Sequence, residues 1–579
     1  MIDLKYSEML SLNNKLKNNL DSSPYSITVL SNIVVHQIRE ILEYLLRSEG
    51  INAIIELGDY DNIVQDSPKY KDSNAIIMFW ELSNIISGLQ YKIELLNNER
   101  LDEILEKTKT EINLVVKNLK NTPLILINKF TSLQFSSSNI TANNLDVLAD
   151  ELNQYLEANV PSNARLIDLN RIIASIGISN CLDWRYYYSS KALYTVEFFK
   201  AYGEYVRPFI LSATGKAKKA LIFDCDDTLW KGILGEDGFD NIEMSTTTKD
   251  GTIFAEIQSL ALTLHKKGVL LGLCSKNNHG DVKEVIVTHP DMQLRDRHFA
   301  IKKINWSDKV TNLKAIAQDL KLGLDSLVFV DNSLFEVNLI REKLPEVTVL
   351  QVPERLYEYP KTLRKSMTLF YNLSFAEEDS KKGEIYKQQA KRDTSKKEFA
   401  DVEDYLASLE QKLTIFEDNE SIIPRIAQMS QKTNQFNLTT KRYTEVDIKK
   451  FTDDVYADVY AFSVSDKFGE SGITGLSIIS LNESVGAAAE IDTLLMSCRI
   501  IGRNIEFVFM DCLIRKMKTR SIKVLKAKYI KTPKNIQVEN FFDRCAFDLI
   551  DEDASVRNYS LTINAYVPFN TNYIEVING

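Results

Sequence analysis

One short segment constrains this chain more than any other, because an apolar run stops abruptly at a group of acids. Residues 221–230 read Leu-Ile-Phe-Asp-Cys-Asp-Asp-Thr-Leu-Trp, with carboxylates at Asp224, Asp226 and Asp227. Apolar residues that run into acids predict a buried strand, because open α/β sheets hold their ligands at the carboxyl ends of their strands. Buried carboxylates need a partner, and the hard cation Mg²⁺ suits them. The alternative is an Asp-rich turn without a ligand.

Two later apolar runs also end in polar side chains. Residues 269–274 run into Ser275, and residues 326–330 run into Asp331. Helices are predicted at residues 257–267 and 308–320, the second with Ser307 as its N-cap. Strands that alternate with helices favour a parallel sheet. Three strand ends would then bring an acid, a hydroxyl and a second acid to one edge.

These residues resemble the four motifs of the haloacid-dehalogenase phosphotransferase superfamily. The resemblance implies that Asp224 is a nucleophile that forms an aspartyl phosphate and that Asp226 is the general acid and base. It also implies that Ser275 and Lys309 hold the phosphoryl oxygens. Mg²⁺ would be held by Asp224, Asp226 and Asp331.

The choice of lysine rests on its place in the chain. Lys276, Lys302 and Lys303 are neighbouring alternatives, but Lys309 begins the helix that leads to the Asp331 strand. Only about forty residues separate the first motif from the second, so no sizeable cap domain is expected there. An uncapped site would admit a large partner.

Length and composition limit the broad class of the protein. A chain of 579 residues is too long for one core, and its net charge of −10 disfavours general nucleic-acid binding. We find no run of 18 apolar residues and no secretion leader, so we expect no membrane insertion and a cytoplasmic location. The six cysteines lie far apart without C-x-x-C spacing and are expected to be free thiols.

Residues 1–215 are predicted to form a first α/β domain. Strands are expected at residues 26–31, 53–57, 75–80 and 123–128, and apolar positions of helical spacing run from residue 34 to 48. This order resembles SGNH-hydrolase-like domains. Ser31 could stand at the nucleophile position, but residues 183–191 contain no histidine as a base. We therefore expect a non-catalytic docking module, with a hidden hydrolase site as the alternative.

A haloacid-dehalogenase-like domain is predicted at residues 216–373, helical linkers at 374–410 and a third domain at 411–579. A helix is expected from residue 423, with strands at 459–464, 472–480 and 489–498. The last strand breaks at Gly502 into a helix start that offers backbone amides to a phosphate. This segment resembles the pyrophosphate loop of GNAT-type acyltransferases, which implies cofactor binding by Gly502, Arg503 and Asn535.

A basic stretch follows that loop. Residues 515–534 hold nine Lys or Arg and no acid. Such a run could meet an acidic carrier protein or its phosphopantetheine arm. A solvated basic face is the alternative.

The whole chain resembles the FkbH-like proteins of polyketide pathways. Matching stretches are residues 224–232, 235–238, 275–277, 304–306, 431–440 and 496–499. The resemblance implies an enzyme that takes 1,3-bisphosphoglycerate, removes its phosphates and delivers a glyceryl group to the phosphopantetheine thiol of an acyl carrier protein. The chain departs from the family at Asp331-Asn332-Ser333-Leu334, where Asp-Asp-Asn-Pro is common, and Glu336 could then supply another ligand.

Acyl transfer needs a thiol nucleophile, and two cysteines are candidates. Cys225 lies within the first motif, but its side chain should point away from Asp224 and Asp226, whose charges would raise its pKa. Cys498 ends a strand between basic residues, which lower a thiol pKa, and we favour it as the acyl acceptor. Its alternative is a buried structural cysteine. Two other functions remain open: a phosphatase without acyl transfer, and a non-enzymatic scaffold.

Overall fold

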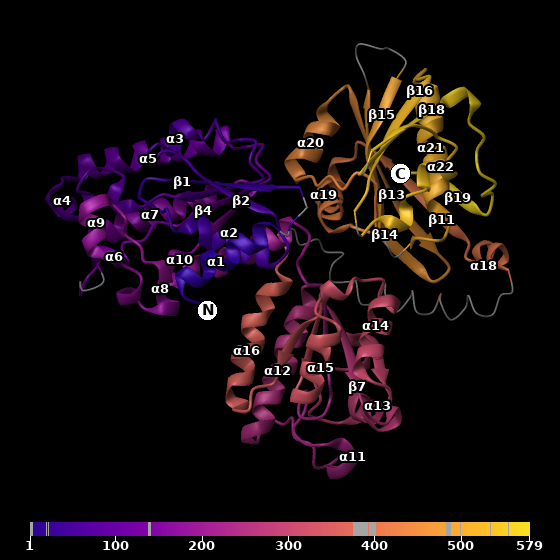
Figure 1. Ribbon diagram of the computed structural model, residues 1–579, viewed down its shortest axis with the longest axis horizontal. Helices are drawn as coiled ribbons and strands as arrows, with labels where there is room; N and C mark the ends of the chain where they lie inside the picture. Colours follow the sequence, from indigo (N-terminus) through magenta and orange to yellow (C-terminus); the bar gives the residue numbers. More distant parts are fainter. Residues whose placement is uncertain are drawn as a thin grey trace. The chain divides into compact units, whose positions relative to one another are not determined.

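The computed structural model describes residues 4–18, 20, 23–136, 140–373, 392, 401–481, 488–497, 500–532, 534–553 and 555–579 (Figure 1). The chain divides into two compact units. The first is Met1–Ile210 with Tyr443–Asp447, and the second is Leu211–Arg442 with Ile448–Gly579. Among the described residues, none of the helices combines the length and apolarity that a membrane crossing requires.

A five-stranded parallel sheet forms the centre of the first unit, in the order β2-β1-β3-β4-β5. Its strands are β1 (Tyr25–Ser31), β2 (Ala53–Leu57), β3 (Ala75–Phe79), β4 (Leu124–Asn128) and β5 (Ala164–Ile167). The larger helices are α1 (Tyr6–Lys17), α2 (Ile38–Ser48), α5 (Asn98–Asn118), α7 (Asn144–Asn159), α8 (Leu169–Ile176), α9 (Trp184–Ser190) and α10 (Val196–Ala213). Short helices are α3 (Ile63–Asp66), α4 (Leu89–Lys92) and α6 (Leu133–Ser136). The four predicted strands are confirmed within one residue, whereas the helix predicted from residue 34 begins at Ile38.

The second unit contains two sheets, and the first of them is parallel in the order β10-β9-β6-β7-β8. Its strands are β6 (Ala220–Phe223), β7 (Leu270–Ser275), β8 (Phe299–Ile304), β9 (Leu327–Asp331) and β10 (Thr348–Gln351). The associated helices are α11 (Leu234–Asp237), α12 (Lys249–Lys266), α13 (His279–Thr288), α14 (Lys309–Asp319), α15 (Leu334–Lys343) and α16 (Tyr359–Ser366). The predicted parallel arrangement is therefore confirmed.

Alternate residues of β6 pack into two different cores. Leu221 and Phe223 join the core that includes residues of α12, α13 and α16, whereas Ala220 and Ile222 join the core of α14 and α15. Burial on both faces explains why the strand is an unbroken apolar run. The 46 residues between β6 and β7 contain only the helices α11 and α12, so no cap domain is inserted there.

The other sheet of this unit is mixed, in the order β17-β18-β16-β15-β14-β13-β11-β19, and β12 pairs with β15. Its strands are β11 (Gln411–Glu417), β12 (Phe436–Asn437), β13 (Ala457–Asp466), β14 (Gly469–Leu481), β15 (Ala488–Met496), β16 (Val524–Ile530), β17 (Asp548–Glu552), β18 (Val556–Thr562) and β19 (Ile574–Asn578). Nearby helices are α18 (Val402–Ser408), α19 (Ile423–Lys432), α20 (Glu445–Asp453), α21 (Ile505–Thr519) and α22 (Phe541–Arg544). The three predicted strands are present, and the helix expected from residue 423 begins there. Most of the predicted linker at 374–410 lies outside the described residues.

Candidate active site

The carboxyl ends of three adjacent strands place the predicted site residues at one edge of the parallel sheet. Asp224 follows β6, Ser275 ends β7 and Asp331 ends β9. Phe223 is in register with Leu273 on one side and with Val330 on the other. The backbone N–H of Asp224 donates to the carbonyl of Val330 at 2.9 Å. The sheet thus gathers residues more than one hundred positions apart in the chain.

Lys309 is the cation at this edge. Its Nζ lies 2.6 Å from Asp331 Oδ2 and 3.2 Å from Asp224 Oδ1, and its side chain is 4% exposed. Burial would lower the pKa of this ammonium, but the charges of Asp224 and Asp331 raise it above its ordinary value. Lys309 therefore stays protonated and holds the two carboxylates together.

The alternative lysines have other acidic partners. Lys276 pairs with Glu336, Lys302 with Asp296 and Lys303 with Asp319. The helix that begins at Lys309 is capped by Asp308, whose carboxylate accepts from the N–H of Thr311 at 2.8 Å. The expectation that Ser307 is the cap was wrong, because the helix starts one residue later and a carboxylate also favours the positive helix end.

Asp226 is held by three protein donors. Its Oδ1 accepts from the indole Nε1 of Trp230 and from the N–H of Leu234, each at 3.0 Å, and its Oδ2 accepts from Asn277 Nδ2 at 2.9 Å. Burial raises the pKa of Asp226 above its ordinary value, although these hydrogen bonds oppose the shift. A fixed carboxyl with a raised pKa suits a group that must donate and take up a proton.

Asn277 and Trp230 were not assigned roles from the sequence. Asn277 lies in the stretch that follows β7, two residues after Ser275, and Trp230 lies four residues after Asp226. For Asn277, the only sequence signal is that its amide lies two residues after Ser275, the predicted hydroxyl at the strand end. The indole donor could not be predicted, because it depends on how the chain turns after Asp227, where φ is +48°.

Several buried oxygens at this edge of the sheet fit a divalent cation. Asp224 and Asp331 are buried carboxylates, the Lys309 ammonium lies 3.2 Å from Asp224 Oδ1, and Thr228 Oγ1 and Glu336 Oε2 are buried without a hydrogen-bond partner among the described residues. Burial and the charge of Asp224 raise the pKa of Asp331, which an added cation would counteract. These oxygens fit a hard cation. Among the described residues, however, no three His, Cys, Asp or Glu side chains are grouped as ligands.

Lys309 and the donors of Asp226 explain why three ligand side chains are not grouped among the described residues. The ammonium lies between the carboxylates of Asp224 and Asp331, and the third predicted ligand, Asp226, has both carboxylate oxygens engaged by protein donors. A metal held by Asp226 would share these oxygens with the protein donors.

The segment that departs from the family pattern still builds a helix start. Asp331 Oδ1 accepts from the N–H of Ser333 at 2.8 Å, and the Ser333 hydroxyl accepts from the N–H of Glu336 at 3.4 Å as the N-cap of α15. Leu334 opens the helix where proline is common in the family, and it is exposed. These bonds cap α15 and orient the Asp331 carboxylate.

Cys225 points into the apolar core. It is fully buried among residues that include Phe223 and Leu229. Burial raises its pKa well above the ordinary value, and the charge of Asp224 adds to the shift. The expectation that its pKa is raised is confirmed, and such a thiol is a poor nucleophile.

The loop before α21 carries two of the predicted cofactor-binding residues. Gly502 has φ of +80°, and no neighbouring atom would meet a side chain there. Arg503 Nη1 pairs with the buried Asp466 Oδ2 at 3.1 Å, and Arg392 forms two bonds of 2.7 Å to the same carboxylate. Cys498 and its neighbour Arg499 lie outside the described residues, so the predicted acyl acceptor is not placed.

Asn535 supports the fold of the same sheet. Its Nδ2 donates to the carbonyls of Asn437 and Ile530, each at 2.9 Å, and its Oδ1 accepts from the N–H of Thr532 at 2.8 Å. The residue is fully buried. These bonds engage both donors of the amide, so Asn535 is oriented towards its own chain in this structure rather than towards a ligand.

A segment of the chain fills the opening where β15 and β16 diverge. The two strands pair in parallel only from Ala488 to Ile491 on β15. Beyond that point β12 pairs with β15, the N–H of Leu438 donates to Leu494 at 3.1 Å, and the N–H of Ile530 donates to Leu438 at 2.8 Å. The backbone groups in this opening are thus bonded to the protein itself.

In the first unit, Ser31 forms a hydrogen bond within its own loop. Its hydroxyl donates to the carbonyl of Ile33 at 2.8 Å, and the residue is buried at the end of β1. The more unusual group of this unit is Glu81, which accepts from the hydroxyl of Tyr194 at 2.8 Å. Burial raises the pKa of Glu81 to about 7. The non-catalytic role of this unit stays a prediction.

Comparison with known proteins shows similarity in fold. No protein-family model and no curated protein matches the chain. Among solved structures, it is similar to the N-terminal part of the protein BF1531 from Bacteroides fragilis, which contains a phosphatase domain complexed with Mg. The TM-score is 0.55 and the identity 23%, over 64% of this chain and 100% of that chain.

Structures of acetyltransferases align with this chain at lower TM-scores. Mutant forms of the spermidine/spermine N-acetyltransferase SpeG from Vibrio cholerae align at a TM-score of 0.22 and 12% identity, over 27% of this chain and 95% of that chain. A complex of spermidine N-acetyltransferase from the same organism with CoA and spermine aligns at 0.21 and 13%, over 27% and 97%. The fold of this chain is multidomain α/β, with two parallel sheets and one mixed sheet.

Proposed function

We propose that the protein is a Mg²⁺-dependent phosphatase and glyceryltransferase. In this proposal it removes phosphate from 1,3-bisphosphoglycerate and passes the glyceryl group to the thiol of an acyl carrier protein. The observation that carries the phosphatase half is the buried arrangement of Asp224, Lys309 and Asp331, with Asp226 held beside it. The likeness in fold to the BF1531 phosphatase domain supports the same half.

The residues present can perform the two steps of phosphate release. A carboxylate oxygen of Asp224 forms a bond to phosphorus while the bond to the leaving oxygen breaks, and the Asp226 proton passes to that oxygen. Water then attacks the phosphorus of the aspartyl phosphate and Asp226 takes up the water proton. The bond from phosphorus to the Asp224 oxygen breaks, which releases inorganic phosphate and restores the carboxylate. The Lys309 ammonium stays charged beside Asp224 and would hold the oxygens of the phosphoryl group.

Asp224 and Asp331 are the residues that would hold Mg²⁺, with Asp226 and, through its unpaired Oε2, Glu336 as further candidates. When bound, the ion would neutralise charge on the phosphoryl oxygens. The phosphatase domain of BF1531 was crystallised with Mg, which supports this choice of metal.

The acyl-transfer half rests on the family resemblance and on the cysteine chemistry. Buried Cys225 has a raised pKa, which disfavours it as the acyl acceptor and leaves Cys498 as the proposed one. The thioester would form as the Cys498 sulfur attacks the acyl carbon and phosphate leaves, and a carrier thiol would then displace Cys498.

The basic stretch at residues 515–534 is the proposed carrier contact. At least five of its nine cations pair with acids of this protein: Lys516, Arg520, Lys528, Lys531 and Lys534. Arg515, Lys518, Lys523 and Lys526 are exposed and would face the acidic carrier.

Intact-mass analysis tests both halves. The protein, Mg²⁺, 1,3-bisphosphoglycerate and a phosphopantetheine-bearing carrier are incubated together, and a glyceryl adduct is expected on the carrier and on the wild-type protein. Cys498→Ala should lose the adduct and the acyl phosphate released by Cys498, but it should retain phosphate release at Asp224, whereas Cys225→Ala should retain all three. Phosphate release without any adduct would support the phosphatase-only alternative.

A further inference from the structure

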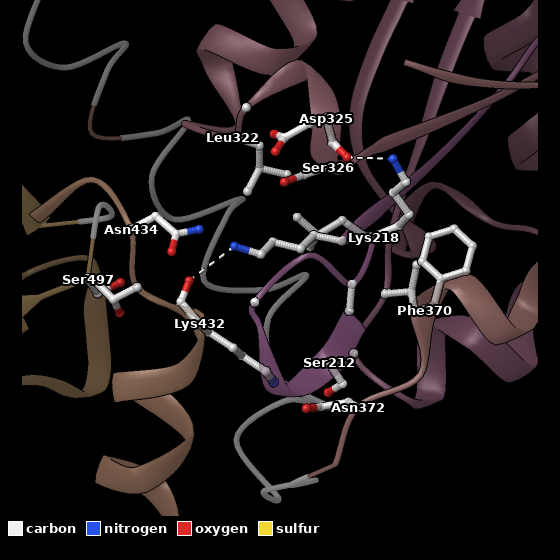
Figure 2. Close-up of a pocket in the computed structure, with 18 of the residues that line it drawn as sticks. Ser212, Lys218, Leu322, Asp325, Ser326, Phe370, Asn372, Lys432, Asn434 and Ser497 are labelled. Carbon is white, nitrogen blue, oxygen red and sulfur yellow. Dashed lines mark hydrogen bonds between the residues drawn. The ribbon is translucent and has the colours of Figure 1, made fainter. Parts of the chain in front are cut away.

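A basic cavity lies in the second unit, apart from the acidic site (Figure 2). Its volume is about 390 Å³, within the size range of small-molecule sites. Among the residues that the structure describes, seven lysine or arginine side chains line it, including Lys267, Lys321 and Lys432, and Asp325 is the one acidic side chain. A wall with six more positive than negative side chains favours an anionic ligand.

The cavity lies at the amino ends of the parallel strands. Lys219 immediately precedes β6, Lys267 lies three residues before β7, and Ser326 immediately precedes β9. Asp224 and Asp331 are at the carboxyl ends of β6 and β9. Lys219 and Asp224 are thus separated by the length of a strand, roughly 16 Å. A phosphate in the cavity would therefore not be the phosphate attacked by Asp224.

The opposite wall comes from the mixed-sheet part of the same unit. Lys432 ends α19, Asn434 lies between α19 and β12, and Ser497 follows β15; Figure 2 shows all three facing the residues around β6. The ammonium of Lys219 donates to the carbonyl of Lys432 at 3.2 Å, and Lys534 pairs with Asp325 at 2.5 Å. These bonds join the two walls.

The lining also indicates the kind of anion. Hydroxyl and amide groups of Ser212, Asn372 and Asn434 lie beside the cations, and Leu322 and Phe370 add apolar surface. Several ammonium groups suit an anion with several acceptor oxygens and up to two charges, as in a phosphate ester. The uncharged part of the lining suits an organic group attached to that phosphate.

We propose that this cavity binds a phosphate ester of a small organic molecule, as a site separate from the acidic strand ends. The shared chemistry is a phosphate group on a small organic body. Two sources offer it: a phosphopantetheine arm and a phosphorylated three-carbon acid. The choice of these two sources rests on the proposed function, whereas the binding of a phosphate ester rests on the lining alone.

Isothermal titration of the full chain tests the proposal. The probes are 4′-phosphopantetheine, 3-phosphoglycerate and pantetheine without its phosphate. At least one phosphorylated probe should bind, pantetheine should bind at least tenfold more weakly than 4′-phosphopantetheine or not at all, and Lys267→Glu with Lys432→Glu should weaken the phosphorylated probe at least tenfold. The probe that binds more tightly identifies the source.

A matched variant separates the cavity from general surface charge. Lys266→Glu with Lys314→Glu makes the same change in net charge at exposed lysines outside the lining, and it should leave the affinity within about twofold. Thermal unfolding verifies folding, and Lys267→Gln replaces the double variant if that does not fold.

The proposal is overturned if neither phosphorylated probe binds, or if the cavity and control variants bind it equally well. Phosphate release measured on the same variants distinguishes this failure from failure of the proposed function, since the cavity lysines do not contact Asp224.

Discussion

Glu81 is predicted to make the stability of the first unit depend on pH. Its side chain is buried, with Tyr194 and Gln134 as neighbours, and its pKa is raised from 4.5 to about 7, mainly by burial. A folded-state pKa above the unfolded value means that the folded protein binds more protons between these two values. The contribution of protonated Glu81 to the free energy of unfolding is therefore fully present below pH 4.5, and it is lost as pH rises through about 7.

The size of the effect follows from the shift. A difference of about 2.5 pKa units, at about 1.4 kcal/mol per unit, lowers the free energy of unfolding by roughly 3 kcal/mol between pH 4.5 and pH 8. Glu81→Gln keeps a neutral side chain at every pH and should remove this part of the slope. The difference in stability between variant and wild type should then change by roughly 3 kcal/mol in favour of the variant as pH rises.

Urea-dependent hydrogen exchange of peptides from β1 and β3 measures the stability of this unit within the full chain, after correction for the intrinsic exchange rate. Glu56→Gln, at an exposed position of β2, is the matched control and should follow wild type. An identical pH slope in wild type and Glu81→Gln would refute the reasoning, as would a wild-type advantage that grows with pH.

Three further predictions concern the acidic site. Asp226→Asn should lower kcat for a phosphate monoester by about 10²–10⁴-fold, because the leaving oxygen loses its proton donor; an equal rate in steady-state phosphate release would contradict this role. Lys309→Met should lower the free energy of unfolding, measured by denaturant titration, by about 3–5 kcal/mol, because two buried carboxylates lose their cation. The control Lys303→Met removes a surface pair and should lower it by less than about 1 kcal/mol. Cys225 should react with a thiol reagent only after unfolding, because it is fully buried; labelling of the native protein, followed by mass, would contradict its place in the core.

The strand ends could be predicted from the sequence because they depend on local pattern. A strand buried on both faces must be apolar throughout, so the first acid after it marks the strand end, as at Asp224 and Asp331. Lys309 was chosen from its neighbours because it begins the helix that leads to the Asp331 strand, the position that the superfamily resemblance implies for the lysine. The structure adds that its ammonium contacts both acids.

Other features depend on contacts that no local pattern encodes. The bond from Asn277 to Asp226 joins residues 51 positions apart, and the bonds of Asn535 include one to Asn437, 98 positions away. The basic cavity takes lysines from separate segments, among them those before β6, before β7 and at the end of α19. The basic run at 515–534 was visible in the sequence, but its internal acidic partners were not.

We propose Asp224 as the nucleophile of a Mg²⁺-dependent phosphatase, and phosphate release by matched acid variants tests this role. Release of inorganic phosphate from 1,3-bisphosphoglycerate is measured for wild type, Asp224→Asn and Asp227→Asn. Each protein is assayed once with Mg²⁺ and once with a chelator, and the rate without protein is subtracted. Asp227 is the matched acid, since its carboxylate bonds instead to Lys231 at 2.8 Å. We predict Mg²⁺-dependent release that Asp224→Asn lowers by about 10³-fold or more and that Asp227→Asn keeps within about threefold. Equal release by wild type and Asp224→Asn, or none by wild type, would contradict the claim.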